Sequence, residues 1–136
     1  MTSQDYVQAA TGVFAAFMRG DIEGFLDAMA DDVVLVSAPG TDEIPWHGIR
    51  RGKEEIRAHL GLVNEHIEVS LLEQSDLLTA ENKVAVVNHM ECEVKKNGEK
   101  VTVNELVHIL TFNESGQVSR WSDVYDGTKL LMAFRR

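Results

Sequence analysis

Positions in the second half of the chain alternate between apolar and polar residues with a period of two, which is typical of half-buried β-strands. Clusters of turn-forming residues interrupt this alternation three times, at residues 80–82, 96–98 and 113–116. The pattern therefore predicts a meander of four strands, at residues 67–78, 83–95, 100–112 and 117–125.

The first half of the chain has a different spacing. Apolar residues recur there every three or four positions, which predicts helices over residues 3–19, from Ile22 to Met29, and from Gly52 to about His66. The β-branched run Val33–Val36 predicts a short strand between the second and third helices, and residues 128–134 predict a last helical turn or two. We expect an α+β fold, a curved mixed or antiparallel sheet wrapped around three N-terminal helices, as a single domain over residues 1–136.

The last two predicted strands bring polar side chains onto an apolar face. With Phe112 opposite Gln117, the alternation pairs His108 with Trp121 and Leu106 with Asp123. His108 and Asp123 would then lie diagonally on one face, about 7–8 Å apart and within side-chain reach. A carboxylate, an imidazole and an indole gathered in this way indicate a pocket for a small molecule.

The turn at Asn97–Gly98 decides which face of residues 83–95 lies beside His108. A two-residue turn would place a histidine and two glutamates there: His89, Glu91 and Glu93. A three-residue loop with Gly98 in the left-handed conformation would instead place Asn88, Met90 and Cys92 there. Burying two unpaired carboxylates is costly, so we expect the second arrangement.

Composition narrows the classes of partner. The 136 residues carry a formal net charge of −9, which argues against nucleic acid and anionic membranes as partners because phosphate binding needs clustered lysines and arginines. Cys92 is the single cysteine, so no internal disulfide can form. No cationic segment precedes an apolar run and no apolar run is long enough to span a membrane, so we expect a cytoplasmic location.

Several short stretches, in this order, resemble the nuclear transport factor 2-like superfamily and in particular ketosteroid isomerase and its SnoaL-like relatives. They are Gly20–Glu23, Ala30–Asp32, Trp46–Gly48, the Asn97–Gly98 turn and Phe112–Gly116. The resemblance covers nearly the whole chain. It implies a cone-shaped fold, in which a curved sheet and three helices enclose a mostly apolar cavity.

The catalytic residues of two relatives do not carry over. The base of ketosteroid isomerase, an aspartate directly before a proline, falls on Ala38, and its hydrogen-bonding aspartate falls on His108. The limonene-type epoxide hydrolases share a Trp-x-Asp pattern with Trp121–Asp123, but their arginine and second aspartate fall on Met90 and Cys92. The resemblance therefore implies neither a true ketosteroid isomerase nor an epoxide hydrolase.

The acid/base aspartate of the SnoaL-like polyketide cyclases does have a match, at Asp123. We predict Asp123 and His108 as catalytic residues, because an Asp–His pair is widely used for proton transfer. We expect the substrate, a small hydrophobic or amphipathic molecule, to contact six further residues: Trp121, Tyr125, Met90, Asn88, Trp46 and Phe14. We expect no cofactor and no metal, since the histidines lack the spacing of metal ligands.

Two functions remain open at this point. The first is a SnoaL-like enzyme of the isomerase, cyclase, lyase or hydrolase type that uses acid/base chemistry. The second is a non-catalytic protein of the same fold that binds a hydrophobic ligand or associates with another protein.

The sheet face turned away from the helices also predicts a partner. Five apolar residues fall on it in the expected register: Ala85, Val87, Val103, Val107 and Ile109. Because an exposed apolar strip usually marks an interface, we expect a homodimer packed through this outer face.

Overall fold

The computed structural model describes all residues, 1–136, and is an α+β fold, as the sequence pattern predicts. Its helices are Ser3–Met18 (α1), Ile22–Asp27 (α2), Gly52–His66 (α3) and Thr128–Phe134 (α4). Its strands are Met29–Ala38 (β1), Gly48–Arg51 (β2), Ile67–Ala80 (β3), Lys83–Val94 (β4), Lys100–Phe112 (β5) and Val118–Val124 (β6).

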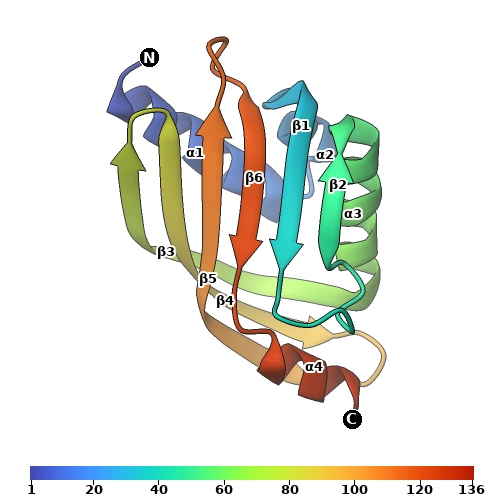
Figure 1. Cartoon of the computed structure of the whole chain (residues 1–136). Coiled ribbons are helices and arrows are strands. Elements are labelled where there is room, and N and C mark those ends of the chain that lie inside the picture. The colour runs from blue at the N-terminus through green and yellow to red at the C-terminus, as the bar shows by residue number, and fades with distance from the viewer.

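The six strands form one curved, mixed sheet in the order β2-β1-β6-β5-β4-β3 (Figure 1). Strands β3 to β6 follow one another as an antiparallel meander, and β1 then pairs with β6 in parallel. Strand β2 has only four residues, too few for a detectable alternation, and was not expected from the sequence.

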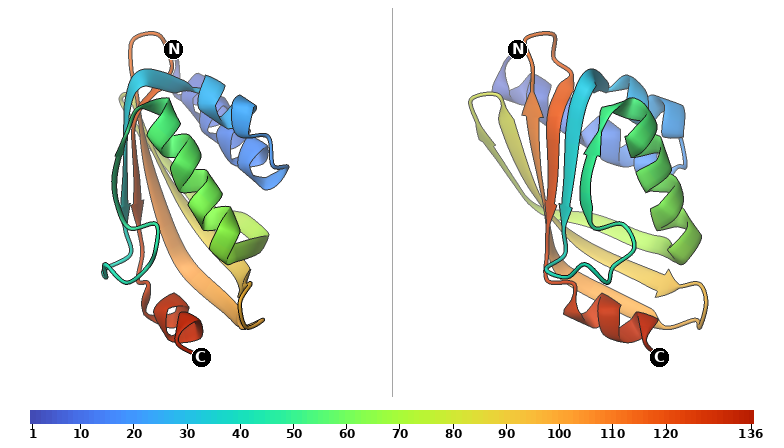
Figure 2. Two further views of the ribbon diagram at one scale, coloured as in Figure 1. Left: turned by 90° about the vertical axis from the view of Figure 1, so that its right-hand side faces the viewer. Right: turned by 45° about the vertical axis from the view of Figure 1, so that its right-hand side comes forward.

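Helices α1, α2 and α3 all lie on one face of the sheet, whereas α4 lies beyond the strand ends at the other end of the molecule from the N-terminus (Figure 2). We call the helix-covered face the inner face and the opposite one the outer face. Thr2 is the N-cap of α1 and forms a reciprocal capping box with Asp5. Asp21 caps α2 by accepting a hydrogen bond from the backbone N–H of Gly24.

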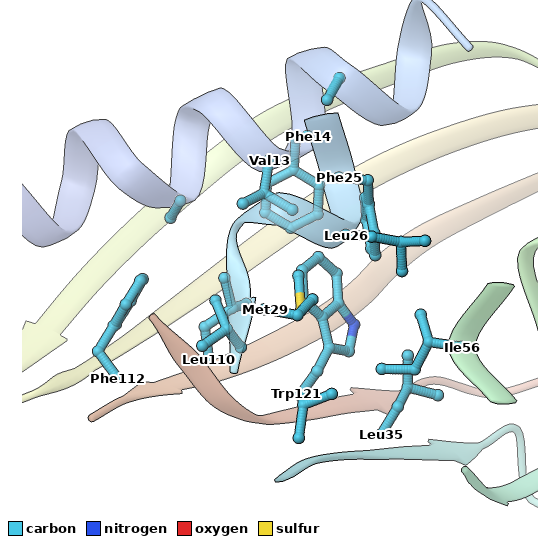
Figure 3. Close-up of a cluster of buried hydrophobic side chains, with 14 of the residues drawn as sticks. Val13, Phe14, Phe25, Leu26, Met29, Leu35, Ile56, Leu110, Phe112 and Trp121 are labelled. Carbon is cyan, nitrogen blue, oxygen red and sulfur yellow. The ribbon is translucent and has the colours of Figure 1, made fainter. Parts of the chain in front are cut away.

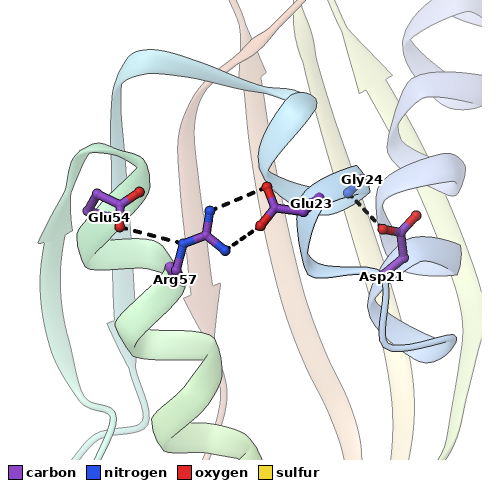
Figure 4. A network of polar contacts seen from close by, with 5 residues as sticks. All are labelled: Asp21, Glu23, Gly24, Glu54 and Arg57. Carbon is purple, nitrogen blue, oxygen red and sulfur yellow. Dashed lines mark hydrogen bonds and ion pairs between the residues drawn. The ribbon is translucent and has the colours of Figure 1, made fainter.

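An exposed ion pair connects α2 to α3. The guanidinium of Arg57 donates to both carboxylate oxygens of Glu23 and lies 3.5 Å from Glu54 (Figure 4). These contacts lower the pKa of Glu23, the hydrogen bond from Arg57 most of all. The ion pair thus joins α2 to α3, and α3 forms one wall of the pocket described below.

The core lies between the inner face and the helices. Trp121 of β6 stacks at tilted angles on Phe14 of α1 and Phe25 of α2, with ring centroids 5.3 Å apart in both pairs (Figure 3). A second buried cluster occupies the bent end of the sheet, where Leu130 and Ala133 of α4 pack beside Trp46. The pocket lies where these two clusters meet.

The register of β5 with β6 differs from the prediction by two residues. The structure pairs His108 with Asp123 and Leu110 with Trp121. Two features explain the shift. Asn113, not Phe112, pairs with Gln117 to close the loop. Strand β6 then has a bulge that inserts Ser119. Because side chains alternate with a period of two, a shift of two residues leaves every side chain on its predicted face.

The face predicted for β4 is correct. Asn88, Met90 and Cys92 are buried on the inner side, and Gly98 has a left-handed φ of 74°. The loop is one residue longer than expected, since Val94 pairs with Glu99.

A bulge near Asn104 and Glu105 compensates for that extra loop residue, and both of these side chains are exposed. It also reverses the face of Val103, which is buried in the inner core instead of lying on the outer strip. Our assignment of Val103 to the outer face was therefore wrong.

None of the helices combines the length and the apolar character that a membrane crossing needs.

Candidate functional site

The sheet wall of the site carries a bonded pair of side chains. Nδ1 of His108 lies 2.5 Å from Oδ1 of Asp123, directly across the β5–β6 ladder. The same carboxylate oxygen accepts a hydrogen bond from Nε1 of Trp121. Hydrogen bonds from His108 on β5 and from Trp121, two positions earlier on β6, therefore hold Asp123 in one orientation.

The pairing also orients the imidazole. When Asp123 is a carboxylate, Nδ1 of His108 donates and Nε2 holds the lone pair of the neutral ring. Nε2 is buried and has no hydrogen-bond partner. Phe14 packs edge-on against the ring, with centroids 4.9 Å apart, so this nitrogen lies in apolar surroundings.

A pocket opens beside this pair. Its volume is about 90 Å³. Fourteen of its seventeen lining residues are hydrophobic. The remaining three are His59, His108 and Asp123, so the lining contains one acidic residue and no lysine or arginine.

A tyrosine and a tryptophan line another part of the pocket. Nε1 of Trp46 donates to the phenol oxygen of Tyr125 over 3.1 Å. Burial raises the pKa of Tyr125 above its usual value, so the phenol keeps its proton at neutral pH. The Tyr125 hydroxyl can therefore donate to a bound molecule while it accepts from Trp46.

His59 enters the pocket from α3. It is 4% exposed, and its Nδ1 has no hydrogen-bond partner. Burial lowers its pKa to about 4; the charge of Asp123 opposes this shift and that of Arg50 adds to it. His59 is thus a neutral imidazole at pH 7.

The structure brings together all but one of the predicted site residues. Asp123, His108 and five of the six expected contact residues line the pocket: Trp121, Tyr125, Met90, Trp46 and Phe14. Asn88 does not. It lies behind Phe14 and Leu72, in a separate surface hollow, and both polar atoms of its amide are buried without a partner.

Sequence reasoning did not place His59 in this site. A signal was available, because His59 follows Ile56 by three positions and precedes Val63 by four, on the inward stripe of α3. Phe25 of α2 and Leu60 of α3 also line the pocket.

Cys92 and metal binding are the two remaining points to consider at the site. Burial raises the pKa of Cys92 to about 11, so its thiol is protonated and unreactive at neutral pH. No three His, Cys, Asp or Glu side chains lie close enough together to hold a metal ion.

Comparison with known proteins identifies the type of domain. The sequence profile of the SnoaL-like domain matches residues 10–121. No curated protein has a sequence that matches this chain.

Solved structures with the same fold are numerous. An NTF2-like protein of unknown function from Burkholderia pseudomallei K96243 superposes with a TM-score of 0.89 at 23% identity, covering 100% of both chains. An NTF2-like protein from Burkholderia xenovorans LB400 gives a TM-score of 0.85 at 27% identity, covering 98% of both chains. TerC, co-crystallised with polyporic acid, gives 0.85 at 23% identity, covering 97% of this chain and 99% of its own.

Proposed function

The chain belongs to the family of SnoaL-like domains, and on that basis we propose that it is a cofactor-independent enzyme that moves a proton on a small hydrophobic molecule. The acid/base unit is the Asp123–His108 pair. The reaction is of the isomerase or cyclase type, in which a proton leaves a carbon next to a carbonyl group and another proton is returned.

One observation carries this proposal. A hydrogen-bonded carboxylate and imidazole, 2.5 Å apart, lie in a pocket whose lining is otherwise almost entirely apolar. Apolar surroundings exclude water and strengthen the electrostatic interactions of the few polar groups within them. Such a pair can accept a proton at Nε2 of His108, where the carboxylate of Asp123 stabilises the resulting imidazolium until the proton is returned.

The proton leaves the substrate carbon for the Asp123–His108 pair, and the electrons of the broken C–H bond move into an enolate. Return of the proton to the same or a different carbon regenerates the pair. No oxidant or reductant is required.

Hydrogen–deuterium exchange tests the proposal without knowledge of the natural substrate. Cyclohexanone is a small, uncharged, mostly apolar ketone with acidic hydrogens beside its carbonyl group. We expect the protein to accelerate exchange of these hydrogens in D₂O, followed by proton NMR. Asp123→Asn should lower this acceleration by about 10²–10⁴-fold, the usual contribution of a positioned acid or base.

Ser122→Ala is the matched control, because Ser122 is the preceding residue of β6 and lies on the outer face. It should exchange at the wild-type rate. Exchange that is equally fast in Asp123→Asn, with the fold intact by circular dichroism, would contradict the proposal.

A second candidate function is ligand binding without catalysis. It is favoured by the double hydrogen bonding of Asp123 Oδ1, which accepts from Trp121 and His108 at once and could serve only to fix the pocket wall. In that case, molecules that bind in the pocket would bind unchanged and no exchange would be accelerated.

We also propose that two copies pack through their outer faces. This is supported by five apolar side chains on that face that are exposed or half-buried in the single chain: Ile49, Leu78, Val107, Ile109 and Val124. They extend across strands from one edge of the sheet to the other. Apolar surface of this extent is usually covered in solution.

A further inference from the structure

His59 occupies a position where the fold calls for an apolar residue. It belongs to the inward stripe of α3, with Ile56 and Leu60 buried on the same stripe. These neighbours pack into the core as hydrophobic side chains should. A histidine among them is buried at a cost unless its polar atoms are used.

No protein group uses the hydrogen-bonding capacity of this ring at Nδ1. His59 is 4% exposed, and its Nδ1 atom is buried without a hydrogen-bond partner. Unpaired buried polar atoms in native proteins call for an explanation, and a group reserved for a ligand is one. His59 lines the same pocket as Asp123 and His108, so a bound molecule can contact it.

The charge state of the ring sets what it can do. Because burial lowers its pKa to about 4, His59 is neutral at pH 7 and has one N–H donor and one lone pair. A neutral imidazole can polarise a carbonyl oxygen by hydrogen bonding without introducing a net charge. Since no protein bond fixes the tautomer at Nδ1, the ring is free to present its N–H as a ligand requires.

We propose that His59 donates a hydrogen bond to the substrate oxygen on which negative charge develops while the Asp123–His108 pair removes a proton. This inference rests on the proposed function and adds a second catalytic group, on the helix wall of the pocket. The sheet wall takes the proton, and the helix wall stabilises the enolate oxygen.

The lining also defines the class of substrate. Asp123 is its only acidic residue, and no lysine or arginine lines the pocket to balance a ligand's negative charge. A carboxylate or phosphate would therefore be repelled. The substrate is an uncharged, mostly apolar ketone or β-diketone, small enough that its reactive part fits the space of about 90 Å³.

A matched pair of probes isolates the hydrogen bond from the hydrophobic contact. The hydroxyl of 4-fluorophenol stands in for the enol oxygen, and fluorobenzene lacks it. Binding of both is measured by fluorine NMR. We expect the wild-type protein to prefer 4-fluorophenol, and His59→Leu to reduce that preference by roughly three- to tenfold, the loss of one hydrogen bond. A merely structural role for His59 would weaken both probes equally.

Two variants complete the design. His59→Gln keeps an N–H donor and should retain most of the preference. His89→Leu is the control, because His89 lies on the outer strand face beside Glu91 and not in the pocket. It should bind both probes as the wild type does.

The outcomes separate this inference from the proposed function. If Asp123→Asn loses the preference for 4-fluorophenol and His59→Leu keeps it, the hydroxyl binds at the sheet wall and the proposed role of His59 is overturned. The exchange assay with cyclohexanone still tests the Asp123–His108 pair in that case. Failure of the wild type to prefer 4-fluorophenol also overturns it. If His59→Leu does not fold, the imidazole nitrogens of wild-type His59 are followed by NMR as 4-fluorophenol is added: a shift supports the hydrogen bond, and an unchanged spectrum refutes it.

Discussion

Both faces of the sheet carry apolar side chains, but the polar groups among them have different surroundings. On the inner face, Asp123 accepts from His108 and Trp121 and is held among hydrophobic residues. On the outer face, polar groups such as Lys83 and Thr111 meet at the exposed surface, beside apolar residues that nothing in the single chain covers.

The difference shows that hydrophobic pattern alone does not distinguish a pocket wall from an interface. The distinction lies in the polar residues. Those of the inner face are few, and hydrogen bonds hold Asp123 and His108 in position, which suits chemistry. The outer face offers an apolar surface with exposed polar groups, which suits association. Substitutions at neighbouring positions on opposite faces can therefore separate the two roles.

The largest effect is expected on the outer face. Val107→Glu places a carboxylate in the proposed dimer interface, where it would be desolvated without a partner. We expect the dimer dissociation constant to rise by at least about 10³-fold, measured by analytical ultracentrifugation, while proton exchange with cyclohexanone is retained. A wild-type protein that is already monomeric at micromolar concentration would remove the proposed interface.

The next effect concerns His59 and the pH dependence of stability. Unfolded, this histidine titrates near pH 6.5, and in the folded protein burial lowers its pKa to about 4. Between these values the unfolded chain binds a proton that the folded protein does not. The contribution of neutral, buried His59 to the free energy of unfolding is therefore complete above pH 6.5. It is lost as the pH falls toward 4, by an amount on the order of 3 kcal/mol.

Urea unfolding at several pH values measures this loss. His59→Leu should show a clearly smaller loss of unfolding free energy between pH 6.5 and pH 4 than the wild type. Identical pH profiles for the two proteins would mean that His59 is not buried in its neutral form.

His108→Gln is the inner-face counterpart of Val107→Glu, one position along β5. Glutamine can still donate to Asp123 but cannot take up a proton. We expect the exchange rate to fall by about 10²-fold, less than in Asp123→Asn, with the dimer unchanged. Dissociation of the dimer by His108→Gln would show that the two faces are not independent.

The smallest effect compares one hydrogen bond from each face. Tyr125→Phe removes the phenol oxygen that accepts the partly buried hydrogen bond from Trp46 and keeps the ring, and it should lower the free energy of unfolding by about 1 kcal/mol. Lys83→Met removes an exposed bond to Thr111 and should change it by less than about 0.5 kcal/mol. Thermal unfolding monitored by circular dichroism would measure both changes. Equal losses of unfolding free energy would contradict the larger contribution expected from the inner-face hydrogen bond.

The sequence predicts the three N-terminal helices and the meander because their periodicity is long and regular. It fails where a single residue is inserted. The pairing of Asn113 with Gln117 and the bulge at Ser119 together shifted the predicted β5–β6 register by two residues. The bulge near Asn104 moved Val103 to the other face. Local patterns do not reveal such insertions, because the partner strand determines where the extra residue is accommodated.

Pocket membership is harder to predict than burial. His59 shares the inward stripe of α3, yet helical spacing cannot tell whether such a residue meets core or open space. Asn88 has the predicted face but lies on the far side of Phe14 and Leu72. Both outcomes depend on how α1 and α3 cross the sheet, which is a property of the assembled fold.

The central claim is that Asp123 and His108 form one hydrogen-bonded acid/base unit on the inner face. Nitrogen NMR of the imidazole rings at neutral pH tests it most directly. The account predicts a proton on Nδ1 of His108, bonded to the carboxylate, and a changed Nδ1 signal in Asp123→Asn with Ser122→Ala as the unchanged control. A His108 ring that carries no proton on Nδ1, or that has the same spectrum in Asp123→Asn, would contradict it.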